Sequence, residues 1–418
     1  MAIILFILIL LALLGLPLFI VLGAGGIYAS HLSELSPVVL IIELYRLANQ
    51  PNLITIPLFS FAGMTMAAGG SPRRLIKLFN ALLGWMPGGL AMAAIVSCAF
   101  FTAFTGASGV TIIALGGLLY PMFIQSNYSD RFSLGLLTSS GSIGLLFPPS
   151  LAILLYGIVS GTNIDELFLA GIIPGIILLI MLSLYSYKSA LSWHEPEHSF
   201  SFKKLLIATR QSFWDILLPI LVMTGIFGGF VTVTEAAAVT AAYALFIESV
   251  IYKEIKLLRD LPDILIDTSK LVGSILIILG IAMGLTNLLI DSQFPNRLLN
   301  LIEDHIDSQL QFLLILNLFL LVMGAIMDIF SAIVVIVPII MPLALRYQID
   351  PVHLGIIFLA NLEIGYMTPP VGINLFIASQ RFGKTIFTLF RSTFPFLIIM
   401  FVWLLMVSYI PELTLWWK

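Results

Sequence analysis

Charged residues are scarce in this chain of 418 residues. They make up only 10% of it, whereas hydrophobic residues make up 60%. About a quarter of the residues in a typical soluble domain are charged. A surface built from this composition cannot remain in water, so a soluble enzyme or regulatory domain is excluded. The net charge of −3 at pH 7 also gives no indication of a nucleic-acid partner.

Cysteine is nearly absent as well. The chain has one, Cys98, in an apolar stretch. A single thiol cannot form a disulfide within the chain or a cysteine-based metal site, so both are excluded. Its surroundings are typical of a small buried hydrophobic side chain.

Long apolar runs are abundant, and they predict an all-α polytopic membrane protein. A helix needs roughly 20 apolar residues to cross a bilayer. The first run begins almost at Met1 and lacks the basic start and cleavage site of a secretory signal, so we expect a retained membrane helix. The segments fall at about 3–22, 31–49, 53–69, 88–122, 132–158, 166–187, 212–230, 234–252, 270–291, 311–343, 353–379 and 386–410.

Two of these segments, 88–122 and 311–343, are too long for one crossing and short for two crossings with a loop. Each has a polar or small-residue centre, at Thr105-Gly106-Ala107-Ser108-Gly109 and at Gly324-Ala325-Ile326-Met327-Asp328. We therefore predict two re-entrant hairpins, whose non-helical tips must be covered by protein or line a water-filled cavity.

The two halves of the chain match at an offset of about 221 residues. Gly63 corresponds to Gly284, Pro148-Pro149 to Pro369-Pro370, and the two hairpins to each other. Several such matches in the same order predict an internal duplication. With five crossings in each half, the second half is inverted relative to the first, an arrangement typical of secondary transporters.

The predicted division follows from this duplication. The first repeat is 1–190, with scaffold helices 1–69, an interfacial arm 71–84, a hairpin 88–122 and a broken helix 132–158. Residues 191–211 are expected to form a cytoplasmic linker. The second repeat is 212–418, with scaffold helices 212–291, an interfacial arm 294–306, a hairpin 311–343 and a broken helix 353–379. The arms are amphipathic, as interfacial helices are, although ordinary connectors remain an alternative.

Basic residues agree with this topology. Of the 19 Lys and Arg residues, all but Arg46, Arg297, Arg346 and Lys418 fall on one side. Cytoplasmic loops carry the excess of positive charge, so the basic side is expected to be cytoplasmic and both termini periplasmic.

The helix breaks are the predicted cation sites. Each contains glycine followed by a Pro-Pro pair, which interrupts the helix and frees backbone carbonyls. Such carbonyls and nearby hydroxyls can coordinate Na⁺. One candidate site comprises Thr105, Ser108, Gly144 and Pro148, and the other comprises Gly324, Asp328, Gly365 and Thr368. The alternative is that the prolines only kink their helices.

Polar side chains near the second break are candidate solute ligands, together with Ser108. They are Asn361, Glu363 and Asn374. Ionisable groups within a membrane are functional candidates by default. Asp328 could instead hold the hairpin tip or carry a proton, Glu363 could cap the broken helix, and the two amides could tie down loose backbone.

Three further motifs favour structural interpretations. His194-Glu195-Pro196-Glu197-His198 matches a zinc-protease pattern, but Pro196 would break the helix that this pattern requires. Phe382-Gly383-Lys384-Thr385 lacks the earlier glycine of a phosphate-binding loop, where Ala378 stands. Thr232 with Glu235, and Asn163 with Asp165, are expected to begin helices.

Taken together, the motifs resemble the large membrane subunit of tripartite ATP-independent periplasmic (TRAP) transporters. The resemblance covers essentially the whole chain. Its most specific parts include Phe104-Thr105-Gly106-Ala107-Ser108-Gly109, Phe147-Pro148-Pro149-Ser150 and Gly365-Tyr366-Met367-Thr368-Pro369-Pro370-Val371-Gly372-Ile373-Asn374-Leu375. Many members have Ser-Gly-Ser at the first tip, where this chain has Thr105-Gly106-Ala107.

The resemblance implies an elevator-type Na⁺ symporter of the ion-transporter superfamily in the bacterial inner membrane. Na⁺ would be the coupling ion, with no organic cofactor. The chain would import an organic acid, of the C4-dicarboxylate, keto acid or sialic acid class, from a periplasmic binding protein. A separate small four-helix membrane subunit would be its partner in the lipid bilayer. Alternatives are a symporter of the same superfamily without a binding protein, a channel, or an intramembrane enzyme.

Overall fold

The computed structural model describes residues 8, 10–11, 16–32, 36–191, 199–292, 306 and 308–418, and these form helices and loops without a β-strand. The α-helices are α2 (Leu18–Leu32), α3 (Val38–Ala48), α4 (Thr55–Ala68), α5 (Ser71–Leu83), α6 (Gly89–Thr105), α7 (Ser108–Gln125), α8 (Asp130–Ser140), α9 (Leu151–Ser160), α10 (Ile164–Ala190), α11 (Phe202–Gln211), α12 (Phe213–Phe227), α13 (Val233–Phe246), α14 (Leu261–Asp291), α16 (Gln309–Ile326), α17 (Ile329–Arg346), α18 (Pro351–Gly365), α19 (Ile373–Phe382) and α20 (Ile386–Tyr409). Short 3₁₀ or π turns are η1 (Pro51–Ile54), η2 (Ile143–Leu146), η3 (Ile247–Ile251) and η4 (Pro411–Leu413).

Many of these helices can cross a membrane. Among the described residues, 8 helices are long and apolar enough, or up to 10 if each of two bent pairs is one span. Helices dominate because every backbone polar group must be satisfied within the segment when no water is available. The prediction of an all-α polytopic membrane protein is confirmed.

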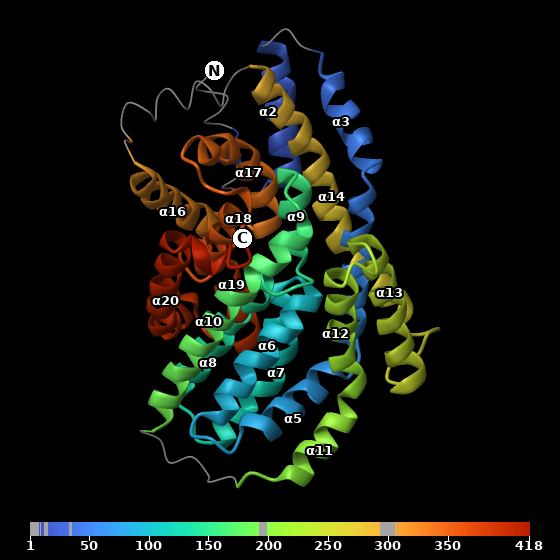
Figure 1. Cartoon of the computed structure of the whole chain (residues 1–418), viewed down its shortest axis with the longest axis vertical. Coiled ribbons are helices and arrows are strands. Elements are labelled where there is room, and N and C mark those ends of the chain that lie inside the picture. Colours follow the sequence, from blue (N-terminus) through green and yellow to red (C-terminus); the bar gives the residue numbers. More distant parts are fainter. Residues whose placement is uncertain are drawn as a thin grey trace.

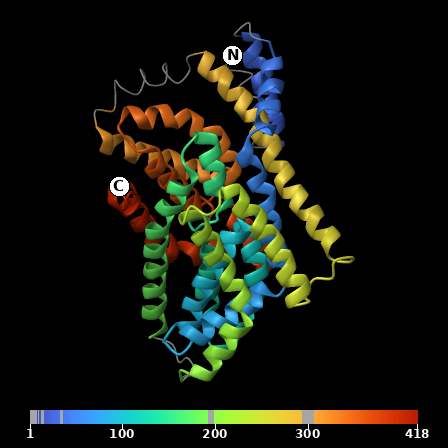
Figure 2. The ribbon, with the colours of Figure 1, turned by 45° about the vertical axis from the view of Figure 1, so that its right-hand side comes forward.

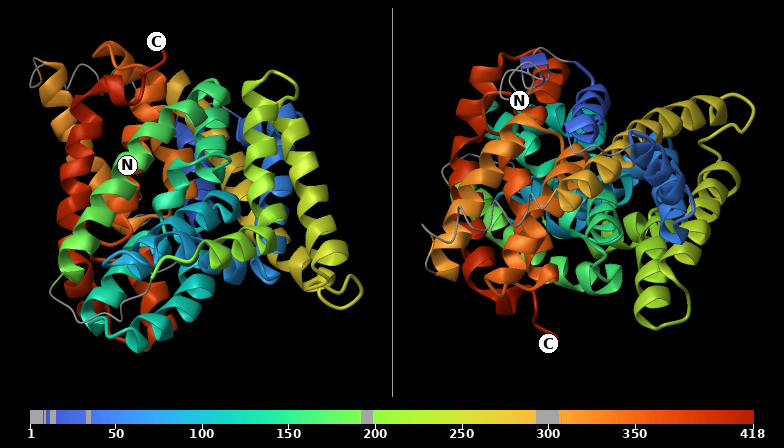
Figure 3. Two further views of the ribbon diagram at one scale, coloured as in Figure 1. Left: turned by 60° about the horizontal axis from the view of Figure 1, so that its bottom comes forward. Right: turned by 90° about the horizontal axis from the view of Figure 1, so that it is seen from above.

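The helices form two groups that lie side by side. One contains α2, α3, α4, α12, α13 and α14, and the other contains the hairpins and broken helices, α6 to α10 and α16 to α20 (Figure 1). In the turned view α2, α3 and α14 lie on the right and α16 and α17 on the left (Figure 2). Seen from above, α12 to α14 stand to one side of the larger group (Figure 3).

The start of the chain differs from the expected segments. The glycine-rich stretch between the predicted segments 3–22 and 31–49 lies inside α2. Gly26 allows close packing, because a Cβ at this position would stand 2.9 Å from the Leu40 side chain of α3. Small residues at helix contacts are favoured in membranes because they let backbones approach. Composition alone therefore misplaced this helix.

Both predicted hairpins consist of two helices joined by two residues. In the first, α6 and α7 have 17 and 18 residues and flank Gly106-Ala107. In the second, α16 and α17 have 18 each and flank Met327-Asp328. An 18-residue helix is about 27 Å long, close to the hydrocarbon thickness. The arms are thus longer than the sequence segments suggested, and re-entry into the same side stays a prediction.

Several helix starts match the expected capping chemistry. Thr232 and Glu235 form a reciprocal capping box at the start of α13. Asn163 caps α10 by accepting a hydrogen bond from the backbone nitrogen of Asp165. These two predictions are confirmed. The predicted arm 294–306 and the motif at 194–198 lie outside the described residues, apart from Ile306.

The predicted arm 71–84 is α5, whose first turn is fixed by a buried charge cluster. Arg74, on α5, donates from Nε and Nη2 to the Asp215 carboxylate at 2.7 and 2.9 Å, and also donates to Glu248. Its guanidinium lies 3.5 Å from the centroid of the Tyr252 ring. The side chains of Asp215 and Glu248 are fully buried. Arg74 thus attaches the arm to α12 and to η3, which continues α13.

Candidate functional site

Each helix break packs tightly against the first arm of its own hairpin. A Cβ on Gly144 would stand 2.2 Å from the carbonyl oxygen of Ala99 on α6. A Cβ on Gly365 would stand 2.6 Å from the Cα of Gly324 on α16. Any side chain at either position would collide with backbone, so glycine is required. The structure therefore brings together the break and the hairpin of each half, as the two proposed cation sites require.

Thr102 ties the first tip to the first break. Its Oγ1 donates to the carbonyl oxygen of Gly141 at 2.8 Å and lies 2.6 Å from Oγ1 of Thr111. The three residues come from α6, the break and α7. Sequence reasoning did not single out Thr102, because its position one turn before the tip becomes significant only when α6 and the break are adjacent.

The first tip and break contain polar atoms without partners. Thr105 Oγ1, Ser140 Oγ and Ser142 Oγ are buried and have no hydrogen-bond partner among the described residues. Leaving a buried hydroxyl unsatisfied costs about 1–3 kcal/mol. A cation that accepts oxygen ligands would use such atoms. Gly144 and Pro148, which also belong to the first predicted cation site, are buried as well.

At the second tip, by contrast, the predicted polar ligands already form hydrogen bonds within the protein. Asp328 caps α17 by accepting hydrogen bonds from the backbone nitrogens of Phe330 at 3.1 Å and Ser331 at 3.0 Å, and from the Ser331 hydroxyl. Thr368 Oγ1 donates to the carbonyl oxygen of Ile364 at 3.0 Å. Of the roles considered for Asp328, the structure shows it holding the hairpin tip; cation ligation stays a prediction.

Two backbone contacts also hold the second break to this tip. The nitrogens of Val371 and Gly372 both donate to the carbonyl oxygen of Ala325 at 3.1 Å. The Tyr366 hydroxyl accepts a hydrogen bond from the backbone nitrogen of Ile329. Tyr366 was part of the recognised motif, yet its tip contact could not be found without knowing which helices pack together.

A buried hydrogen bond joins the first hairpin tip to the segment after the second break. Ser108, at the start of α7, donates from Oγ to Oδ1 of Asn374 on α19 at 2.7 Å. Both side chains are buried. Nδ2 of Asn374 has no partner among the described residues, so this amino group is available to donate to a solute. The structure thus places two of the four predicted solute ligands in direct contact.

The other two solute candidates lie elsewhere. Asn361 donates from Nδ2 to Oδ1 of Asn317 at 2.7 Å, and Ser408 donates to the same oxygen at 3.1 Å. This network joins α18 to α16 and α20, which favours the structural role for Asn361. The sequence did not indicate a role for Asn317 or Ser408, because both lie in apolar segments and outside any recognisable motif.

Glu363 is the least satisfied side chain near the breaks. It is fully buried, and neither carboxylate oxygen has a hydrogen-bond partner among the described residues. An isolated ionised carboxylate is very costly in an apolar environment. Glu363 therefore needs either a proton or a bound cation, and an anionic solute would be repelled by its ionised form.

The two breaks differ in exposure. Pro148 and Pro149 are buried, whereas Pro369 and Pro370 are exposed. Both Pro-Pro peptide bonds are cis. Since the breaks occupy corresponding positions in the chain, the molecule is asymmetric: the first break is enclosed and the second is open.

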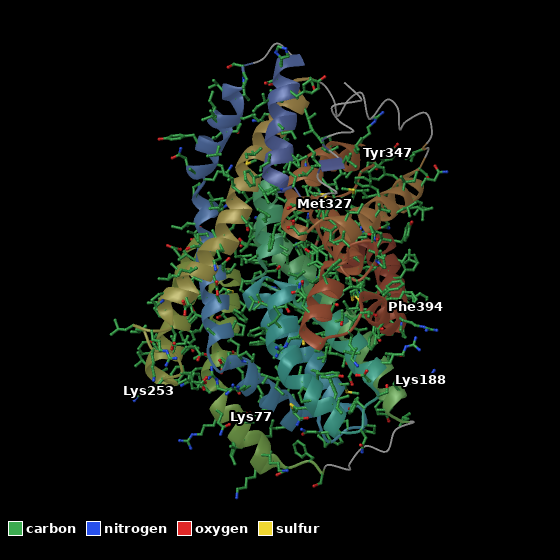
Figure 4. All side chains as sticks on the ribbon, turned by 180° about the vertical axis from the view of Figure 1, so that it is seen from behind. Lys77, Lys188, Lys253, Met327, Tyr347 and Phe394 are labelled. Carbon is green, nitrogen blue, oxygen red and sulfur yellow. The ribbon has the colours of Figure 1, made fainter. Side chains whose placement is uncertain are left out.

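Three lysines of the predicted basic side lie toward the same end of the molecule. Figure 4 shows Lys77, Lys188 and Lys253 toward one end and Met327 and Tyr347 toward the other. The three lysines belong to the set that the sequence placed on the basic side. Their common location agrees with that assignment, while the sidedness of the termini stays a prediction.

Comparison with known proteins identifies the family. The family described as "Tripartite ATP-independent periplasmic transporter, DctM component" matches residues 5–413. The chain is 35% identical to a C4-dicarboxylate TRAP transporter large permease protein of Pseudomonas aeruginosa over 377 residues, which is 90% of this chain and 88% of that protein. It is 30% identical to the ectoine TRAP transporter large permease protein of Halomonas elongata, over 97% of this chain and 96% of the relative.

A further relative and one solved structure are informative. The isethionate TRAP transporter permease protein DctMQ of Oleidesulfovibrio alaskensis is 33% identical over 87% of this chain but only 57% of its own length. The crystal structure of the YdaH transporter of Alcanivorax borkumensis superposes with a TM-score of 0.55 at 13% identity, covering 88% of this chain and 86% of that one. The latter likeness concerns the fold alone. The chain belongs to the DctM family and is the large membrane subunit of a bacterial TRAP transporter.

Proposed function

We propose that this chain is the permease subunit of a Na⁺-coupled importer of an organic acid. The solute would be delivered by a periplasmic binding protein and carried across the inner membrane by an elevator movement, with both chain termini on the periplasmic side. Family membership supports the transport class. The observation that carries the site is the buried Ser108–Asn374 hydrogen bond, which joins the first hairpin to the segment after the second break.

The unequal tips support cation coupling. The first tip has unpartnered hydroxyls within the described part of the chain, including Thr105 Oγ1, whereas Asp328 at the second tip already accepts hydrogen bonds from α17. We therefore expect the first cation site, formed by Thr105, Ser108, Gly144 and Pro148, to bind Na⁺ with less rearrangement than the second site. The second, formed by Gly324, Asp328, Gly365 and Thr368, would require local rearrangement.

The unequal exposure of the two breaks supports an elevator. Alternating access requires two states in which related parts of inverted repeats exchange environments. An enclosed first break and an open second break correspond to one such state. The moving body would comprise both hairpins and both broken helices, and α5 would connect it to the remaining helices.

The solute class and partners rest on the relatives. Proteins with 30 to 35% identity to this chain are named for three different solutes, a C4-dicarboxylate, isethionate and ectoine. We favour an organic acid because two of these three solutes, the C4-dicarboxylate and isethionate, are anions of organic acids. The DctMQ relative extends well beyond the match, which supports a second membrane component, here a separate small four-helix subunit.

Uptake into proteoliposomes tests the proposal. The chain would be reconstituted with its small subunit, and a labelled organic acid presented with the binding protein, with and without an inward Na⁺ gradient. Uptake that needs both Na⁺ and the binding protein is the expected result. Uptake without the binding protein would instead indicate a conventional organic-anion symporter, and uptake indifferent to Na⁺ would contradict cation coupling.

Two variants test the sites. Ser108→Ala and Asp328→Ala are expected to fold and to lose Na⁺-coupled uptake. Ser97→Ala is the control for the first, because Ser97 is a buried serine of the same hairpin whose hydroxyl donates within its own helix, to Ala93 at 2.6 Å. Uptake at the wild-type rate in both site variants would contradict the proposed cation sites.

A further inference from the structure

A pocket of about 370 Å³ lies between the arm helix α5 and the helix α11, away from the candidate transport site. Its polar and basic lining residues include Lys77, Asn80 and Lys204, and its apolar wall includes Trp85, Phe200 and Ile207. No acidic side chain of the described ranges lines it. The pocket is therefore positively charged on one part of its wall and apolar on another.

The two lysines of this pocket are not neutralised by their described neighbours. Neither Lys77 nor Lys204 forms an ion pair within the described part of the chain. Both are exposed. They come from different helices, yet they line the same pocket, so an anion placed in it would meet both charges.

The location indicates the source of that anion. Lys77 lies at the basic end of the molecule (Figure 4), where α5 and α11 are found in Figure 1. The Trp85 ring packs edge-on against Phe200, with centroids 6.0 Å apart, and Trp85 remains 49% exposed. Tryptophan at such positions is typical of the membrane–water interface.

Helix α11 has the composition of an interfacial helix. Phe202, Leu206 and Ile207 are 70%, 59% and 48% exposed, and Lys203, Lys204 and Arg210 are exposed on the same short helix. A second groove beside it is lined by Arg210 and Trp214 among others. Apolar side chains next to basic ones are what a phospholipid with an anionic headgroup requires.

We propose that the pocket between α5 and α11 binds an anionic phospholipid of the adjoining leaflet, with its phosphate between Lys77 and Lys204. Its glycerol and acyl chains lie over Trp85, Phe200 and Ile207. The bound lipid bridges the arm helix and α11, and the site does not depend on the identity of the transported solute.

Native mass spectrometry of the full-length chain in detergent tests this inference. Phosphatidylglycerol and phosphatidylcholine with identical acyl chains are titrated onto wild type, Lys77→Gln/Lys204→Gln and Lys188→Gln/Lys256→Gln. The last variant loses the same charge from basic-side lysines that do not line the pocket. We expect one tightly bound phosphatidylglycerol on wild type and on the control, and roughly thirtyfold weaker binding to the pocket variant.

Three outcomes would overturn the proposal. They are equal binding of the two lipids by wild type, equal weakening in both double variants, and displacement of phosphatidylglycerol by millimolar inorganic phosphate, which would indicate a site for a soluble anion. Ile207→Glu adds an independent test, because it introduces a carboxylate into the pocket while both lysines remain. It must also weaken phosphatidylglycerol binding, and unchanged binding would contradict the site.

Discussion

Ser108 and Asn374 are 266 residues apart in the chain, yet they share a buried hydrogen bond of 2.7 Å. The bond connects the start of α7 with the first turn of α19, so it joins the tip of one hairpin to the break in the opposite half. Buried polar contacts of this kind fix the relative position of the elements that they join. If the hairpins and breaks move as one body, this bond should persist in every state of the transport cycle.

A double-mutant cycle measures that coupling. Ser108→Ala and Asn374→Ala should each destabilise the protein, and the double variant should lose less than the sum by about 0.5–1.5 kcal/mol, because the shared bond is lost only once. Unfolding in detergent provides the free energies. Additive losses would show that the two side chains do not interact, and Ser97→Ala, paired with Asn374→Ala, supplies the additive control.

Gly365→Ala should disturb the second break. Its Cβ would stand 2.4 Å from the carbonyl carbon of Gly324, so α16 and α18 must separate. Such overpacking costs about 1–3 kcal/mol. Gly273→Ala is the matched control, because Gly273 lies within α14 and a Cβ added there would meet no described atom within 4 Å. Equal thermal stability of the two variants would contradict the tight contact.

Arg74→Gln should be the most damaging of these substitutions. It leaves the carboxylates of Asp215 and Glu248 buried without their cation, and breaking a buried ion pair in this way costs about 3–5 kcal/mol. Arg73→Gln, at the exposed neighbouring position, should change the free energy of unfolding by less than about 0.5 kcal/mol. The loss should be partly recovered by adding Asp215→Asn; an unimproved double variant would contradict the charge explanation.

Glu363 can be tested by its neutral isostere. Glu363→Gln keeps the shape and removes the ionisable group, so the protein should fold with at least wild-type stability if Glu363 is protonated in the resting state. Glu363→Ala should lose about 2–5 kcal/mol through the cavity that it leaves. Thermal unfolding distinguishes the two, and Na⁺ dependence of the unfolding temperature in wild type but not in Glu363→Gln would show that the carboxylate binds the cation instead.

The features that the sequence predicted are those set by local chemistry. The Pro148-Pro149 and Pro369-Pro370 pairs remove backbone donors wherever they stand, so the breaks could be placed from residue type alone. Thr232 and Asn163 have side chains that cap a helix within three residues. The long apolar runs likewise predicted a membrane protein, because runs of about 20 apolar residues have the length of a membrane-spanning helix.

The features that escaped prediction depend on which helices meet. Asn317, Asn361 and Ser408 form one network only because α16, α18 and α20 pack together. Gly26 lies in the middle of α2 because Leu40 packs against it, whereas its residue type alone favours a helix end. Polar side chains in apolar segments acquire their roles from partners distant in sequence, and a single sequence does not reveal those partners.

The attachment of α5 also has a consequence for biogenesis. Arg74 is synthesised 141 residues before Asp215 and 174 before Glu248. Until those acids emerge from the ribosome, the arm carries a cation for which its final partners do not yet exist. Helix α5 therefore cannot take its final place during insertion of the first half. The buried ion pairs of the arm therefore form only after the chain has been synthesised past Glu248 in η3, so the first elements of the second half complete the packing of a helix that belongs to the first half.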